Sequence, residues 1–102
     1  MATSKCEVRG SQLVATGDFP TDVDTSFDGA CRQLLAGPAK ELVADLSRVG
    51  YMSSTYIGLL AELALDARNA GKTLKIVAGP KLASVLKEAG LDAAAEIEGP
   101  GR

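Results

Sequence analysis

Polar and apolar residues change their spacing several times along this chain, and each change predicts a secondary-structure element. Residues 7–8 and 12–16 are short β-prone stretches. Gly10 and Ser11 lie between them and are typical of a tight turn, so the two stretches predict a β-hairpin. We expect the second strand to stop at Gly17 and Asp18.

Three later stretches place apolar residues every three or four positions, the spacing of an amphipathic helix. They extend from about residue 21 to 36, from 53 to 69 and from 80 to 89, and each is followed by a glycine, which commonly ends a helix. Thr21 or Asp22 is the expected cap of the first helix. The predicted buried faces are Val23, Phe27, Ala30, Cys31 and Leu34; Ile57, Leu60, Ala61, Ala64 and Ala67; and Leu82, Val85, Leu86 and Ala89.

Short apolar runs between the helices predict further strands. Residues 41–46 suit a central strand that is covered on both faces, residues 74–78 another strand, and residues 94–97 a weak last one. Strands that alternate with helices favour a parallel sheet. We therefore expect an α/β fold: a small mixed, largely parallel sheet with an N-terminal hairpin and about three helices. Residues 1–98 would form a single domain and 99–102 a flexible tail.

Charge and composition exclude one large class of function. The 102 residues include 11 basic and 13 acidic ones, scattered along the chain, for a formal net charge of −2. No basic run is present that would neutralise several phosphates, and four aromatic residues are too few for a base-stacking platform. Nucleic acid is therefore not an expected partner.

The residues needed for common enzyme chemistry are missing. The chain has no histidine, which removes the Ser-His and Cys-His arrangements and the usual zinc sites. Neither glycine-rich phosphate loop occurs. Asp22, Asp24 and Asp28 have the spacing of a solvated helix face, with a weak divalent-cation site as the alternative. We expect no enzymatic activity, no cofactor and no metal.

The two cysteines and the N-terminal sequence indicate in which cellular compartment the protein is expected. Cys6 and Cys31 favour small apolar residues in a reduced protein, although a disulfide between them stays open. The sequence MATSKCEVRG lacks the apolar core of a signal peptide, and no stretch is long enough to span a membrane. The expectation is a cytoplasmic protein without membrane insertion.

The most informative stretch is DLSRVGYMSSTYIGLL, from Asp45 to Leu60. It resembles the signature of STAS domains (sulfate transporter and anti-sigma factor antagonist), in which a strand ends in Asp-Leu-Ser and Asp-Ser-Ser-Gly-Leu-Gly or a similar run opens a helix. The resemblance covers about residues 6–97. Other motifs that match in order and spacing are Gly17-Asp18-Phe19, Ala70-Gly71-Lys72 and Ala89-Gly90-Leu91-Asp92.

The resemblance implies a protein-interaction domain in signalling and transcription regulation. In regulatory STAS members a partner anti-sigma factor, which is a serine kinase of ATPase fold, phosphorylates a serine at this helix start. The unphosphorylated form binds the kinase, and phosphorylation releases it. The matching residue here is Ser54, with Ser53 and Thr55 as other possible acceptors. The alternative is that these residues only cap a helix.

The same helix carries a second apolar row beside its buried face. Tyr56, Leu59 and Leu63, together with Ser53, are the candidate partner-binding residues, and packing of the row against a neighbouring helix is the alternative. The sequence departs from the family pattern at two of these positions. Tyr56 replaces a glycine or another small residue, and its ring is large enough to obstruct a partner; Ser53 replaces a frequent acidic residue. The final amphipathic helix of most members is also not evident after residue 98.

Two other functions fit the same expected fold. One is a constitutive STAS scaffold subunit of a signalling or lipid-transport complex. The other is a sensor of a small ligand, a nucleotide or a lipid, in a crevice near Gly17, Asp18, Asp45 and Ser53.

Overall fold

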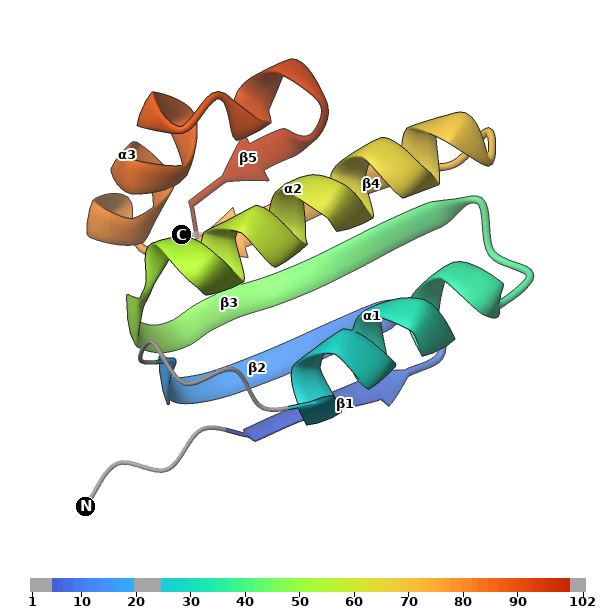
Figure 1. The fold of residues 1–102 in the computed structure, drawn as a ribbon, viewed down its shortest axis with the longest axis horizontal. Coiled ribbons are helices and arrows are strands. Elements are labelled where there is room, and N and C mark those ends of the chain that lie inside the picture. The colour runs from blue at the N-terminus through green and yellow to red at the C-terminus, as the bar shows by residue number, and fades with distance from the viewer. Residues whose placement is uncertain (1–4, 20–24, 100–102) are drawn as a thin grey trace.

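The computed structural model describes residues 5–19 and 25–99, and in this part of the chain five strands form one sheet with three α-helices (Figure 1). The predicted α/β class, with a largely parallel sheet and an N-terminal hairpin, is confirmed. The elements are β1 (Lys5–Arg9), β2 (Gln12–Phe19), α1 (Thr25–Ala36), β3 (Glu41–Met52), α2 (Ser54–Asn69), β4 (Thr73–Ala78), α3 (Pro80–Glu88), a 3₁₀ turn η1 (Leu91–Ala93) and β5 (Glu96–Glu98).

The hairpin of β1 and β2 is closed by a tight turn at Gly10. The two strands pair antiparallel, with Lys5 opposite Thr16 and Arg9 opposite Gln12. Gly10 has φ of 61°, a left-handed conformation that glycine adopts without steric cost. The strands β2, β3, β4 and β5 then pair parallel to one another.

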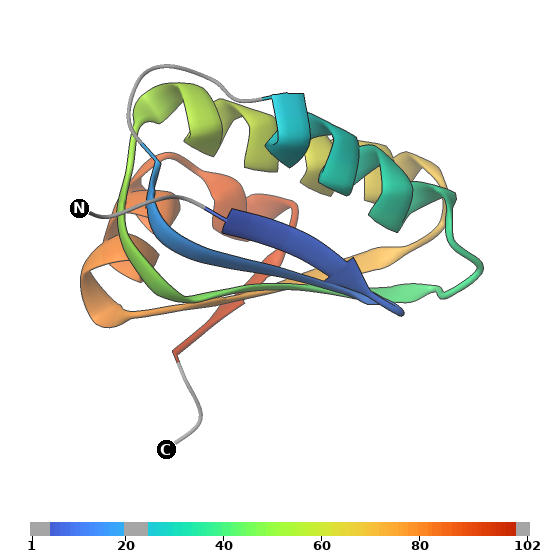
Figure 2. The ribbon, with the colours of Figure 1, turned by 90° about the horizontal axis from the view of Figure 1, so that it is seen from below.

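All three helices lie on one face of the sheet because the strand order follows the chain order without reversal. Crossovers between neighbouring parallel strands are nearly always right-handed, so successive steps in one direction keep their helices on the same side. Figure 2 shows α1 and α2 on that side of the sheet, seen edge-on. No helix of the described residues covers the other face. The expectation that residues 41–46 are covered on both faces is therefore wrong.

The core lies between this sheet face and the helices, and alternate strand residues point into it. Strand β2 contributes Leu13 and Ala15, and β4 contributes Leu74 and Ile76. The remaining buried residues of the sheet and the helices join them in a single apolar cluster.

Three elements differ from the sequence prediction. Strand β3 continues to Met52 and β2 continues to Phe19, because register shifts in their pairing let both strands pass the polar residues that were expected to end them. In α3 only Leu86 is fully buried, whereas Val85 is exposed, as is Ala89 directly after the helix. The predicted cap residues of α1, together with Val23, Asp24 and residues 100–102, lie outside the described residues.

Candidate functional site

Helix α2 starts at a fixed place, directly after the long strand β3. Ser53 is its N-cap residue, with extended backbone angles. The backbone N–H of Ser53 donates to the carbonyl oxygen of Phe19 at 2.8 Å, and the Ser53 carbonyl oxygen accepts from Ile57 N–H at 3.0 Å. The first bond ties the start of α2 to the end of β2, and the second is the first hydrogen bond of the helix itself. The three serine and threonine residues therefore occupy defined positions at the carboxyl edge of the sheet.

The three candidate acceptors differ in exposure. Ser54 and Thr55, the first two residues of α2, are exposed, whereas Ser53 is only 5% exposed. Because Ser53 is buried, Ser54 and Thr55 are the more accessible of the three predicted acceptors. The Ser53 hydroxyl does not cap the helix, and the first turn contains no acidic residue. The positive end of the α2 dipole is therefore not neutralised by a side chain of the turn itself.

The apolar row on α2 packs inward and does not form a ridge. Tyr56 is 1% exposed and Leu63 is 2% exposed, and Leu59 is half-buried. The Tyr56 ring meets Phe27 of α1 and Phe19 of β2 edge-on, at centroid distances of 5.2 and 5.1 Å. The row therefore packs against α1 and the sheet, which is the alternative that the sequence left open, and little of Tyr56 or Leu63 is accessible to a partner. For the same reason the Tyr56 ring does not project from the surface beside Ser54.

Exposed apolar side chains gather instead beside the start of α3. Tyr51, near the end of β3, is 56% exposed, and Val85 of α3 is 44% exposed. Both line a hollow of about 290 Å³ between β3 and α3; its other residues are Gly50, Met52, Lys81 and Leu82. The sequence pattern does not predict this group, because the apolar run of the strand ends at residue 46 and the helical spacing puts Val85 on the buried face.

The motif Gly17-Asp18-Phe19 lies beside the same end of β3. Asp18 pairs with Tyr51 in the strand register. Gly50 is crowded by Asp18: a Cβ atom at position 50 would lie 2.8 Å from Asp18 Oδ1. The family-like motif of β2 and the signature stretch of β3 thus meet at one edge, next to the start of α2.

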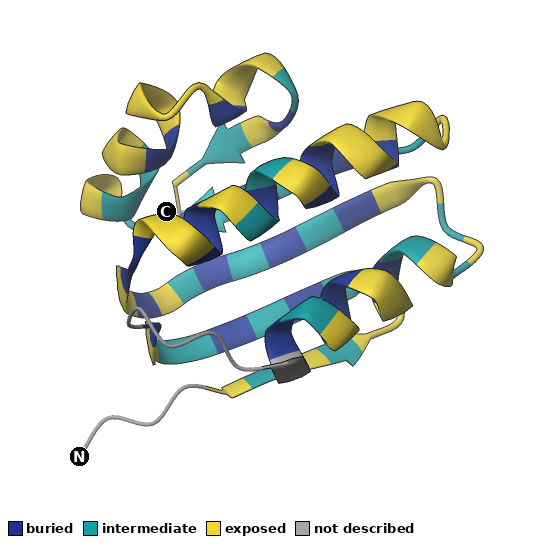
Figure 3. Cartoon of the chain, in the orientation of Figure 1, coloured by how far each residue is buried: buried dark blue, intermediate teal, exposed yellow. Residues whose placement is uncertain are grey.

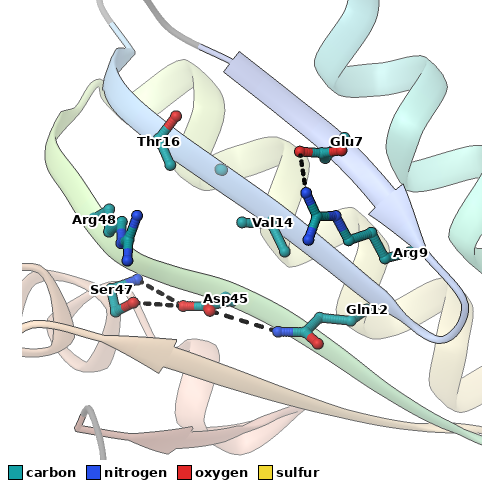
Figure 4. Close-up of a pocket in the computed structure, with 9 residues that line it drawn as sticks. Glu7, Arg9, Gln12, Val14, Thr16, Asp45, Ser47 and Arg48 are labelled. Atoms are coloured by element: carbon teal, nitrogen blue, oxygen red, sulfur yellow. Dashed lines mark hydrogen bonds and ion pairs between the residues drawn. The ribbon is translucent and has the colours of Figure 1, made fainter.

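The proposed ligand crevice is not formed. Asp45 lies on the open sheet face, away from Ser53, and Ser47 donates to Asp45 Oδ1 through its N–H at 3.0 Å and its hydroxyl at 2.7 Å (Figure 4). A pocket of about 420 Å³ surrounds Asp45, and its lining includes neither Asp18 nor Ser53. Two of the charged residues that line this pocket form an ion pair with each other, because Arg9 contacts Glu7 at 3.2 Å. The prediction that the four crevice residues come together is wrong, because the unreversed strand order creates no switch point.

Asp28 of α1 and the two cysteines, which the sequence also singled out, show no sign of a metal site or a disulfide in the described residues. Asp28 forms an ion pair with Arg32 at 3.2 Å along α1. Among the described residues, no group of three or more potential metal-ligating side chains is found. Neither Cys6 nor Cys31 forms a disulfide. Burial raises the pKa of Cys31 to about 12, with smaller contributions from Asp28 and Cys6, so this thiol stays protonated at neutral pH. In the part of the chain that the structure describes, no helix is long and apolar enough to cross a membrane.

Comparisons with known proteins agree with this geometry. A family model described as Mlab, STAS domain, matches residues 5–98. The fold is similar to the crystal structure of an anti-sigma factor antagonist from Mycobacterium paratuberculosis, with a TM-score of 0.74, 22% identity, and coverage of 96% of this chain and 86% of that one. It is also similar to the anti-sigma factor antagonist SpoIIAA in its unphosphorylated form, with a TM-score of 0.68, 13% identity, and coverage of 98% and 90%. No curated protein sequence matches the chain. Since the family model spans nearly all of its residues, this protein belongs to the STAS domain family and has the fold of anti-sigma factor antagonists.

Proposed function

We propose that this protein is a cytoplasmic partner-switching regulator of transcription, of the anti-sigma factor antagonist type. Its partner would be an anti-sigma factor that is a serine kinase of ATPase fold, and Ser54 would be the phosphorylated residue. The observation that carries the proposal is the position of Ser54: an exposed hydroxyl at the first residue of α2, between the buried residues Ser53 and Tyr56.

A phosphate at Ser54 is compatible with the fold. It adds about −1.5 to −2 charges at neutral pH. The free N–H groups and the dipole at a helix N-terminus favour a negative charge by ~0.3–1 kcal/mol when the site is exposed. Because Ser54 is exposed, the modification displaces no packed side chain. The phosphorylated protein therefore keeps its structure.

The same charge opposes a docked partner. A protein surface that covers Ser54 would have to bury the phosphate, and an unpaired buried charge costs several kcal/mol. A tenfold loss of affinity needs only about 1.4 kcal/mol. Phosphorylation at Ser54 can thus release a partner without unfolding the domain.

One observation favours a second candidate, a constitutive scaffold subunit of a multi-protein complex such as a lipid-transport complex. The matching family model carries the description Mlab, STAS domain, and not that of a phosphorylated regulator. A scaffold would bind its partner through the same carboxyl edge of the sheet, but its affinity would not depend on whether Ser54 is phosphorylated.

A pull-down from lysate of the source cell, with mass spectrometry of the retained proteins, separates the two candidates. Four baits are compared: wild type, Ser54→Ala, Ser54→Glu, and Gln33→Glu as a control with the same charge change on exposed α1 surface. Partner switching predicts an ATPase-fold kinase on every bait except Ser54→Glu. Retention of the same protein by all four baits would favour the scaffold. If Ser54→Glu and Gln33→Glu lose the protein together, the effect is not specific to Ser54.

A further inference from the structure

We propose that the hollow between β3 and α3, formed around Tyr51, Leu82 and Val85, receives an apolar side chain of the partner protein with a carboxylate next to it. This inference rests on the proposed function, since it assigns the chemistry of the partner at the same edge as Ser54. The occupant is a protein segment that presents one aliphatic or aromatic residue beside an aspartate or glutamate.

The apolar part of the argument comes from exposure. Only Tyr51, Leu65 and Val85 are large apolar residues that are strongly exposed in the described chain, and two of these three line the same hollow. Val85 lies one residue before the fully buried Leu86, so α3 shows apolar side chains on two sides. Figure 3 shows that most of α3 is exposed or only partly buried. Exposed apolar residues that cluster around a hollow are typical anchor sites of interfaces.

The charge of the occupant follows from Lys81. It is the one ionisable side chain with a positive charge in the lining, and within the described residues no ion pair to it is found. Lys81 is the second residue of α3, where the helix dipole disfavours a cation, and the first turn has no acidic residue to offset it. The positive charge of Lys81 is unfavourable at this helix end in the free protein, and a carboxylate that docks beside it would offset that charge.

The hollow also links the partner to Ser54. Helices α2 and α3 both begin at the carboxyl edge of the sheet, although β3 continues from Leu46, opposite Ala78, to Met52 before α2 begins. Met52 lines the hollow and lies two residues before Ser54. The left end of the molecule in Figure 1 is this carboxyl edge. A partner that fills the hollow and extends past Met52 to cover Ser54 would have to bury a phosphate placed there. Release by phosphorylation therefore needs no change of conformation.

The chemistry of the hollow is tested without knowing the partner. Two blocked dipeptides, acetyl-Leu-Glu-amide and acetyl-Leu-Lys-amide, are titrated into the ¹⁵N-labelled protein at millimolar concentration. We expect amide shifts confined to residues 50–52 and 81–85, several-fold larger with the acidic peptide, and a reversed preference in Lys81→Glu. Equal shifts with both peptides, or shifts elsewhere on the surface, would overturn the proposal.

The protein retained in the pull-down, once purified, tests docking itself. Val85→Asp should weaken its binding about tenfold or more, since anchor residues dominate interface energies. Leu65→Asp is the matched control, an equal change at an exposed apolar residue of α2 outside the hollow, and should alter binding less than about twofold. Circular dichroism checks that both variants are folded.

The two proposals fail in distinguishable ways. If Val85→Asp binds like wild type while Ser54→Glu does not, the hollow is not the docking site and the switch stands. If Val85→Asp loses binding and Ser54→Glu keeps it, the hollow is the docking site and Ser54 is not a switch. If Leu65→Asp weakens binding as much as Val85→Asp, docking is not specific to the hollow, and that inference is wrong.

Discussion

Helices α2 and α3 begin at the same edge of one sheet, yet they bury very different shares of their surface. Helix α2 spans Ser54–Asn69 and buries six residues, whereas α3 spans Pro80–Glu88 and buries Leu86 alone. The longer helix is held by the core along its whole length. It provides a rigid position for Ser54, while the shorter helix leaves apolar side chains free for contact with another protein.

The two tyrosines of the chain are expected to show the largest difference in stability between the two helix environments. Tyr56 of α2 is enclosed by two phenylalanine rings, and Tyr51 beside α3 is exposed. Tyr56→Ala should lower the free energy of unfolding by about 3–5 kcal/mol, since it leaves a cavity in the core. Tyr51→Ala should change it by less than about 0.5 kcal/mol. Urea unfolding of both variants measures the difference, and similar losses would contradict the burial assigned to α2.

A second test lies within α3 and uses neighbouring residues. Leu86→Ala removes a fully buried side chain and should cost about 2–5 kcal/mol. Val85→Ala removes an exposed one and should cost less than about 0.5 kcal/mol. The same urea series measures both. A loss at Val85 as large as that at Leu86 would mean that the hollow is part of the core and not a surface for a partner.

The third test uses the pH dependence of stability to examine the burial of Cys31 on α1. The folded protein holds the Cys31 pKa near 12, above the ordinary value of 9.0, so above pH 9 the unfolded chain loses a proton that the folded chain keeps. Stability should therefore be unaffected by this thiol below pH 9 and should fall as pH rises from 9 toward 12, by at most about 1.4 kcal/mol per pH unit. Cys31→Ala should remove that part of the slope. Identical slopes for the variant and the wild type would show that Cys31 is not buried as described.

The smallest expected effect concerns Ser54 itself. Ser54→Glu should leave the free energy of unfolding unchanged or raise it by ~0.3–1 kcal/mol, because it places a negative charge at the α2 N-terminus. Added salt should reduce that gain. A loss of more than about 1 kcal/mol would show that Ser54 has a packing role, and loss of binding in Ser54→Glu would then have a structural cause.

Periodicity and turn residues were sufficient to predict the α/β class and the order of the helices and strands. The helix over Ser54–Asn69 and the strand over Thr73–Ala78 follow their predicted stretches closely, because each pairs a regular apolar pattern with a glycine stop. The extension of β3 to Met52 was not predictable in this way. It depends on register shifts against β2, which are properties of strand pairing and leave no local pattern in the sequence.

The site was predicted less completely. The resemblance to STAS domains located Ser54, but helical spacing alone could not tell which apolar row of α2 faces α1. A second row at positions 56, 59 and 63 is equally compatible with a docking ridge and with packing against a helix, and the structure shows packing. Val85 was misassigned for a related reason. Successive residues such as Val85 and Leu86 lie on neighbouring sides of a helix, and only the tertiary arrangement decides which of them faces the core.

We propose that phosphorylation of Ser54 controls a partner that docks at the carboxyl edge of the sheet, where α2 and α3 begin. The most direct test incubates the purified partner with this protein and Mg-ATP, maps the phosphorylated residue, and measures the dissociation constant of both forms. The account predicts phosphate on Ser54, a dissociation constant raised at least about tenfold, and an unchanged urea midpoint. Equal affinity of the two forms, or a phosphate on another residue with Ser54 unmodified, would contradict it.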